Sequence, residues 1–169
     1  MFREGDIVLR PWSSSDAPEL TRLANNPKIA QFMTDGFPHP YTQGDAEKFI
    51  SFATSHQLVR IFAVEYKGQL AGGIGLHPQQ DISRKNAELG YWIAEPFWGL
   101  GIATQAVRMI TASGFGLAGV SRIYARPFGT NVASQRVLAK AGYKLEAIIP
   151  GGFFKGGQYI DEHIYAIRM

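Results

Sequence analysis

The sequence predicts a layered α+β (α/β) domain in which strands and helices mix around one sheet. Runs rich in β-branched and aromatic residues alternate with segments whose apolar residues recur at helical spacing, and glycine or proline separates most of them. The chain has 169 residues, which fits one domain spanning 1–169, and 46% of them are hydrophobic, which is enough for a substantial core. The 18% of charged residues is too few for a disordered protein.

In the first third of the chain, one strand and two helices are expected. Residues 7–10 are a β-branched run, and the Ser-Ser-Ser-Asp run at 13–16 offers N-caps for a helix after it. Thr42 and Asp45 have the spacing of a capping box, which predicts a second helix from Thr42. The two prolines within residues 37–41 exclude regular structure there and indicate a loop.

The remainder is expected to add strands at residues 61–66, 70–76, 87–94, 122–125, 143–149 and 159–168. The first three of these follow one another closely, so we expect an antiparallel meander. One helix is expected to follow Gly101 and run through Ser113, and another to occupy residues 131–140, where Gly142 ends it. The sequence therefore predicts about seven strands in one sheet, with helices packed against it as layers.

Composition excludes several functional classes. The chain has no cysteine, which excludes disulfides, thiolate metal sites and cysteine nucleophiles. The four histidines, His39, His56, His77 and His163, have no metal-ligand spacing, so no metal is expected. The net charge of +3 is spread along the chain, which favours a small anionic ligand over nucleic acid. No apolar run reaches membrane-span length and the start lacks a signal-peptide pattern, so we expect a soluble protein without membrane contact.

The strongest local signal is the turn Gly99-Leu100-Gly101 between a predicted strand and a predicted helix. Glycine lets a ligand approach the backbone closely, and the first turn of a helix offers unpaired N–H groups and a partial positive charge. Such a turn suits a phosphate group. Glycine turns before helices also serve packing, so this interpretation stays open, and the spacing matches neither Gly-x-Gly-x-x-Gly nor the P-loop.

Five ordered motifs make the chain resemble a known family. They are Ile-Val-Leu-Arg-Pro at 7–11 with Asp16-Ala17, Tyr41-Thr42 with Asp45-Ala46, Glu-Leu-Gly-Tyr-Trp-Ile at 88–93, Trp-Gly-Leu-Gly-Ile-Ala-Thr at 98–104, and Asn-Val-Ala-Ser at 131–134 with Lys-Ala-Gly-Tyr at 140–143. With these, the chain resembles the GNAT superfamily of acyl-CoA-dependent N-acetyltransferases. It is most similar to the subgroup named for the ribosomal-protein N-terminal acetyltransferases RimJ and RimL. The resemblance implies a mostly antiparallel central sheet with helices on both faces.

The resemblance also implies acetyl-CoA as co-substrate and names the residues that hold it. The backbone of Tyr91, Trp92 and Ile93 would pair with the pantetheine arm. The pyrophosphate would be held by the amides of Trp98, Gly99, Leu100, Gly101, Ile102, Ala103 and Thr104. Asn131 would contact the cofactor, although an ordinary N-cap role is the alternative. Pro96 stands where the family has a polar side chain, so phosphate binding must rest on backbone amides and the helix dipole.

For catalysis, the resemblance implies direct attack of an amine on the thioester. Glu88 is then the candidate general base, with a solvated or ion-paired strand residue as the alternative. Leu138 stands where many family members have a tyrosine acid, and Ser134 is our replacement candidate, with water as the alternative. At pH 7, an α-amino group of pKa about 8 is deprotonated at a cost of about 1.4 kcal/mol, against about 4.6 kcal/mol for a lysine amine. A protein N-terminus therefore needs less help from a base.

The last set of candidate residues concerns binding of the acceptor amine. His39 and Tyr41 are candidate acceptor-binding residues in a loop that could equally be packed by its own aromatic rings. We expect Trp12 and Phe32 to belong to the core, Arg126 to be solvated, and loops 36–42 and 150–158 to set specificity.

Three functions stay open at this point. The first is acetylation of a primary amine, with a protein N-terminal amine ahead of other acceptors. The second is acetylation of a small amine such as a polyamine, an amino acid or an aminoglycoside. The third is a non-catalytic acyl-CoA sensor. A cytoplasmic homodimer is the default expectation for assembly and location.

Overall fold

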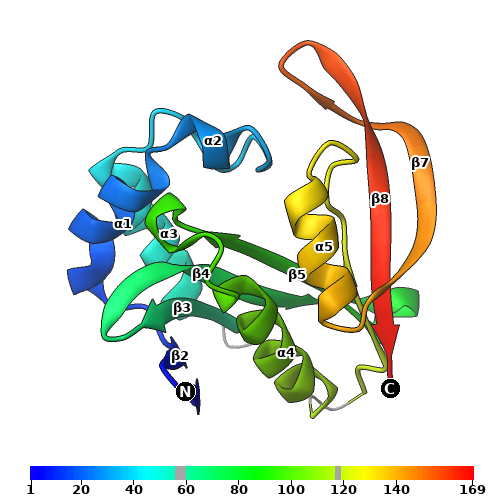
Figure 1. The fold of residues 1–169 in the computed structure, drawn as a ribbon, viewed down its shortest axis with the longest axis horizontal. Coiled ribbons are helices and arrows are strands. Elements are labelled where there is room, and N and C mark those ends of the chain that lie inside the picture. Colours follow the sequence, from blue (N-terminus) through cyan, green and yellow to red (C-terminus); the bar gives the residue numbers. More distant parts are fainter. Residues whose placement is uncertain (56–59, 117–118) are drawn as a thin grey trace.

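The computed structural model describes residues 1–55, 60–116 and 119–169. Within these residues, eight strands form one sheet in the order β1-β2-β3-β4-β5-β6-β8-β7 (Figure 1). The strands β1 to β8 are Phe2–Glu4, Ile7–Arg10, Arg60–Tyr66, Gln69–Pro78, Asn86–Ile93, Arg122–Ala125, Lys144–Lys155 and Gln158–Arg168. Neighbours are antiparallel except β5 and β6, which run parallel. This confirms the predicted mixed, mostly antiparallel sheet and its β3-β4-β5 meander.

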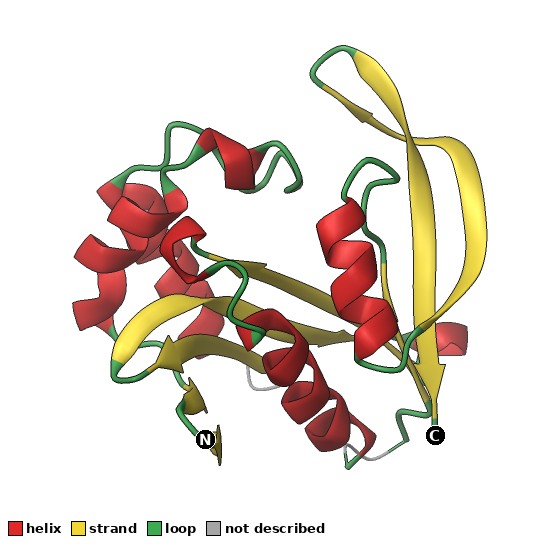
Figure 2. Ribbon diagram, in the orientation of Figure 1, coloured by secondary structure: helices red, strands yellow, loops and turns green. Residues whose placement is uncertain are grey.

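Helices cover both faces of this sheet (Figure 2). The α-helices α1 to α5 are Ala17–Ala24, Pro27–Ala30, Gln43–Ser55, Ile102–Phe115 and Val132–Lys140, and the short 3₁₀ helices η1 to η3 are Ser14–Asp16, Asp81–Ser83 and Glu95–Phe97. In the described part of the chain, no helix has both the length and the apolar character needed to cross a membrane.

Two hydrophobic clusters form because side chains alternate between the faces of each strand. In β3, Val64 joins the cluster beneath α4 and α5, whose members include Ile110 and Leu138. Its neighbour Ala63 joins the other cluster, beneath α1 and α3, together with Leu20. The central strands therefore lie between two helical layers, and both layers contribute to the candidate site.

The expected local signals at the start of α3 are present. The Thr42 N–H donates to the Asp45 carboxylate at 2.9 Å, and the Asp45 N–H donates to the Thr42 hydroxyl at 3.3 Å. This is the predicted capping box. Residues 37–41 contain neither helix nor strand, as their prolines indicate.

Three expectations about secondary structure are corrected. The residues of β1 form an extra edge strand, in which Phe2 pairs with Leu9. The short helix α2 was not expected, although Asn26 caps it through its side chain and Pro27 starts it. Residues 150–158 are mostly strand rather than loop, because β7 continues to Lys155 and β8 begins at Gln158, with a two-residue turn between them. The glycines at 151–152 lie where the strand register shifts, between Ile149 and Phe153. The glycine-rich composition therefore marks an irregularity within the β7-β8 hairpin and not the end of β7.

Candidate active site

A cavity of about 1200 Å³ opens where β5 and β6 separate. The two strands pair only at Asn86 with Arg122, Ala87 with Ile123, and Glu88 with Tyr124. Beyond Glu88, β5 continues to Ile93 without β6 beside it, while its other edge stays paired with β4. One edge of β5 therefore presents its backbone N–H and C=O groups to the cavity, which suits an extended ligand that pairs like a strand.

At the end of that exposed edge lies the glycine turn before α4. Gly99 and Gly101 have φ of 78° and 77°, a left-handed conformation that strongly favours glycine. Gly101 is the N-cap of α4 and supplies no side chain to bond the helix amides. The N–H groups of the first helical turn are therefore left for a ligand, beside the positive end of the helix dipole.

Most residues expected to bind the cofactor line this one cavity. They are Tyr91, Trp92, Ile93, Trp98, Gly99, Gly101, Ile102, Ala103, Thr104 and Asn131. Leu100 is the exception, because its side chain is exposed and the residue lies outside the cavity lining. The Trp98 indole donates to the Ile93 carbonyl at 2.7 Å, which ties the glycine turn to the end of β5.

Asn131 and Ser134 lie at the start of α5. The Asn131 Oδ1 accepts a hydrogen bond from the Ser134 N–H at 3.1 Å, so the capping role is present. The Ser134 Oγ lies 2.8 Å from the Tyr91 hydroxyl, which comes from β5. Burial raises the pKa of Tyr91, so its phenol keeps its proton at neutral pH. The structure therefore connects Ser134 to a tyrosine that the sequence patterns had assigned only a backbone role.

Glu88 lies at the point where β5 and β6 separate and contacts β6. Its carboxylate accepts a hydrogen bond from the Tyr124 hydroxyl at 3.3 Å, and its other oxygen lies 3.8 Å from the Arg126 guanidinium. On β4, His77 is directly opposite Glu88, and burial lowers the pKa of His77 although Glu88 opposes that shift. Glu88 and His77 both line the cavity.

Arg126 was expected to be a solvated cation, and it is at the surface, with its side chain 38% exposed. It is also ion-paired, because its guanidinium Nε donates to the buried carboxylate of Glu162. Arg126 therefore links two carboxylates, those of Glu88 on β5 and Glu162 on β8.

The residues expected on the acceptor side lie in three different places: the hydrophobic core, the cavity wall and the surface. Tyr41 is buried and also lines the cavity, and burial raises its pKa to about 12. His39 is exposed and is not part of the cavity lining. Trp12 belongs to the core as expected. Phe32 was also expected in the core, but it is only half-buried and lines the cavity, because the segment after α2 turns toward the hairpin.

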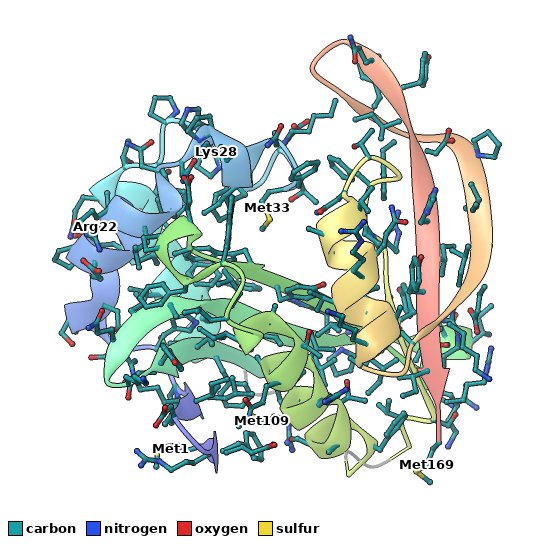
Figure 3. All side chains as sticks on the ribbon, in the orientation of Figure 1. Met1, Arg22, Lys28, Met33, Met109 and Met169 are labelled. Atoms are coloured by element: carbon teal, nitrogen blue, oxygen red, sulfur yellow. The ribbon has the colours of Figure 1, made fainter. Side chains whose placement is uncertain are left out.

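Sequence patterns missed further residues of this cavity. Two cations on α5, Arg136 and Lys140, line it one helical turn apart, and Phe128 and Phe153 add two rings from the far side. The spacing of Arg136 and Lys140 was a usable signal, since residues four apart lie on the same face of a helix. Figure 3 shows the labelled Met33 side chain in the space between α2 and α5.

In the described ranges, no group of three or more His, Asp or Glu side chains is arranged to hold a metal ion. His56, one of the four histidines considered from the sequence, lies outside those ranges.

Comparison with known proteins gives this geometry a family context. Residues 6–144 match the family model of the acetyltransferase (GNAT) domain. The uncharacterized N-acetyltransferase YoaA of Bacillus subtilis is 28% identical over 166 residues, covering 95% of this chain and 92% of that protein. The spermidine N(1)-acetyltransferase of Escherichia coli K12 is 27% identical over 169 residues, covering 96% of this chain and 84% of that protein.

Among solved structures, one of the similar folds is RimL, a ribosomal L7/L12 alpha-N-protein acetyltransferase in complex with coenzyme A. It superposes with a TM-score of 0.87 at 22% identity, over 98% of this chain and 96% of that one. At this identity the similarity shows a shared fold, and it does not assign the acceptor of RimL to this chain.

Proposed function

Since the chain belongs to the GNAT acetyltransferase family, we propose that its cavity binds acetyl-CoA and a primary amine together and transfers the acetyl group directly between them. One observation carries the proposal. The free edge of β5 and the uncapped N-terminus of α4 lie on the same cavity, so a strand-like ligand with an anionic end has a backbone partner and a phosphate site in one place.

The cofactor half of the cavity assigns roles to the residues expected from the sequence. Backbone groups of Tyr91, Trp92 and Ile93 pair with the pantetheine arm, and the amides at 98–104 bind the pyrophosphate. Asn131 uses its Oδ1 in the helix cap, so it contacts the cofactor through its Nδ2 group. Arg136 and Lys140 add positive charge for the remaining phosphate.

The reaction requires a neutral amine and a proton for the departing sulfur. The amine nitrogen forms a bond to the acetyl carbon, and the bond from that carbon to the CoA sulfur breaks. Glu88 accepts the proton that the amine loses, and Ser134, hydrogen-bonded to Tyr91, supplies a proton to the thiolate. Protons balance when Glu88 releases its proton to solvent and Ser134 regains one from it.

Two classes of amine are candidates for the acceptor. A protein N-terminal amine is favoured by its lower deprotonation cost and by the family resemblance to RimJ and RimL. A small amine is the second candidate, because a relative of similar identity is named as a spermidine N(1)-acetyltransferase. We also propose that residues 1–169 form one domain and that the protein acts as a cytoplasmic homodimer.

The test combines a cofactor-induced melting shift with release of free thiol from acetyl-CoA over a panel of amines. A melting shift with thiol release supports the proposal, and the responding amine class selects the acceptor. A shift without release from any amine would indicate a non-catalytic acyl-CoA sensor. Absence of any shift would mean that the turn at 99–101 does not bind the cofactor.

A further inference from the structure

Three glycines of the central sheet, Gly73, Gly75 and Gly90, line the floor of the cavity, and among these three Gly90 alone has open space at its Cβ position. Gly90 lies in the middle of β5, directly opposite Gly75 of β4, and it is exposed. A Cβ built on Gly90 would meet no atom within 4 Å, whereas one on Gly75 would lie 3.2 Å from Ile61. Residues two apart on a strand point to the same face, so the open position at Gly90 lies between the side chains of Glu88 and Trp92. The paired residue Gly75 of β4 lies on this face too.

Apolar side chains from separate segments form the walls around this floor. They come from the segment after α2, from α3, from the loop after β6 and from β7, namely Phe32, Met33, Phe37, Phe49, Phe128 and Phe153. The Phe37 ring lies 5.9 Å from the Trp92 ring, and the Phe128 and Phe153 rings are 5.1 Å apart. A group entering the cavity on this side therefore meets mainly carbon.

A polar contact holds two of these walls together. The Lys155 ammonium, near the tip of the β7-β8 hairpin, donates to the Met33 carbonyl and lies 3.7 Å from the Asp35 carboxylate. These contacts tie the hairpin to the segment after α2. The aromatic rings from the hairpin and from that segment are thus held on the same cavity.

The charge of the cavity favours an acceptor with a single positive group. Among the described residues that line it, Glu88 is the one carboxylate, whereas Lys28, Arg126, Arg136 and Lys140 are cations. Arg126 lies 3.8 Å from Glu88 and offsets part of its charge. A polyamine that carries several positive charges would find one carboxylate to pair with among the described lining residues, whereas a single amine needs no more than one.

From these observations we infer that the acceptor is a primary amine attached to a bulky apolar or aromatic group. The amine lies at Glu88 and the apolar group lies over Gly90 between the aromatic walls. Its source is a free arylalkylamine or a protein N-terminus whose first residue is large and apolar. This inference rests on the proposed function and specifies its acceptor.

The test compares initial rates of thiol release from acetyl-CoA with 2-phenylethylamine, ethylamine and spermidine. Two peptides that differ only in an N-terminal Phe or Ser form the second arm, which separates a free amine from a protein N-terminus. Burial of the phenyl ring is expected to raise kcat/KM for 2-phenylethylamine about tenfold or more above that for ethylamine. The Phe peptide is expected to exceed the Ser peptide by a similar factor if an N-terminus is the source.

Two variants locate the preference in the structure. Gly90→Val places a branched side chain over the floor, in a strand where valine is readily accommodated, and should reduce the ratio between 2-phenylethylamine and ethylamine toward one. Phe153→Ala removes one wall and should reduce the same ratio without filling the floor. Gly44→Ala, at an exposed position of α3, is the control and should leave the ratio unchanged.

The outcomes distinguish failure of the proposed acceptor from failure of the proposed function. Faster acetylation of spermidine or of the Ser peptide than of the apolar acceptors overturns this inference and leaves the proposed function intact. A cofactor-induced melting shift with no release from either apolar acceptor also overturns it. No melting shift with acetyl-CoA overturns the proposed function itself, and this inference with it.

Discussion

The Tyr91 hydroxyl lies 2.8 Å from the Ser134 Oγ and 3.3 Å from the Ser134 carbonyl oxygen. Tyr91 belongs to β5 and Ser134 to the first turn of α5, so this contact joins the sheet to the helix where β5 loses its partner strand. Because burial raises the pKa of Tyr91, the pair keeps its proton at neutral pH, where a carboxylate base is ionised.

Removing either hydroxyl of this pair should slow the reaction. We expect Ser134→Ala and Tyr91→Phe each to lower kcat about tenfold or more, because the thiolate then leaves without a positioned proton donor. The double variant should lose little more than the worse single variant, since the two groups act as a unit. Steady-state thiol release measures all three.

A second tyrosine in the molecule provides a matched control. Tyr143 makes the same kind of contact with Thr111, at 2.7 Å between hydroxyl oxygens, and both side chains are buried outside the cavity lining. Tyr143→Phe should lower the melting temperature and leave kcat near that of the unaltered protein. Equal kcat losses in Tyr91→Phe and Tyr143→Phe would contradict a role for Tyr91 in proton supply.

Glu88→Gln should lower turnover most at low pH. There the amine is mainly protonated and depends on a base, whereas at higher pH the neutral amine becomes available without one. The ratio of kcat/KM between the unaltered protein and the variant should therefore fall as pH rises from about 6 to 9.

The control for this loss is another strand glutamate with arginine partners. Glu146 on β7 pairs with Arg122 of β6 and Arg168 of β8, and Glu146→Gln should leave the pH profile unchanged. A loss at Glu88→Gln that is the same at every pH would assign Glu88 a structural role.

Local signals predicted the elements whose stabilising contacts are close in sequence. The capping box of Thr42 and Asp45 and the glycine turn at 99–101 each depend on neighbours within a few residues, and both are found as expected. Residues 150–155 were misassigned because a Pro-Gly-Gly run indicates a loop locally. Pairing with β8 across the hairpin outweighs that tendency.

The site was predictable only in part, for the same reason. Tyr91 and Ser134 are 43 positions apart, and neither sequence motif indicates that the Tyr91 side chain contacts α5. The period of two in β5 could have placed Glu88, Gly90 and Trp92 on one face. The rings that meet over that face come from segments whose approach depends on the tertiary fold, including the contact of Lys155 with Met33.

Gly99→Val should abolish acetyl-CoA binding beyond what its cost in stability explains. Valine at a φ of 78° is strained by about 1–2 kcal/mol, and its branched side chain also keeps the phosphate from the backbone. Gly68→Val is the matched control, because Gly68 also has a φ of 78° and open space at its Cβ but lies in the turn between β3 and β4.

Calorimetric titration with acetyl-CoA distinguishes the two glycine variants. Both should melt a few degrees lower, by about 2–4 °C per kcal/mol for a chain of this size. Only Gly99→Val should lose the cofactor heat. Equal affinities for acetyl-CoA in the two variants would exclude this turn as the phosphate site.

His77 should make folding stability depend on pH in one defined window. Burial lowers the pKa of His77 below its ordinary value of 6.5, although the facing Glu88 carboxylate opposes the shift. Below pH 6.5 the unfolded chain therefore binds a proton at this histidine more readily than the folded chain. Stability contributed by the neutral imidazole is present above pH 6.5 and is lost as pH falls from there toward the folded pKa.

Replacing His77 should flatten that dependence. Urea unfolding of His77→Gln between pH 5 and 7.5 is expected to show a smaller rise in unfolding free energy with pH than the unaltered protein. A parallel His39→Gln variant, at the exposed position of the 37–41 loop, shows how much of the change follows from removing any one imidazole. A steeper rise in His77→Gln would mean that the Glu88 carboxylate outweighs burial and holds His77 protonated in the folded protein.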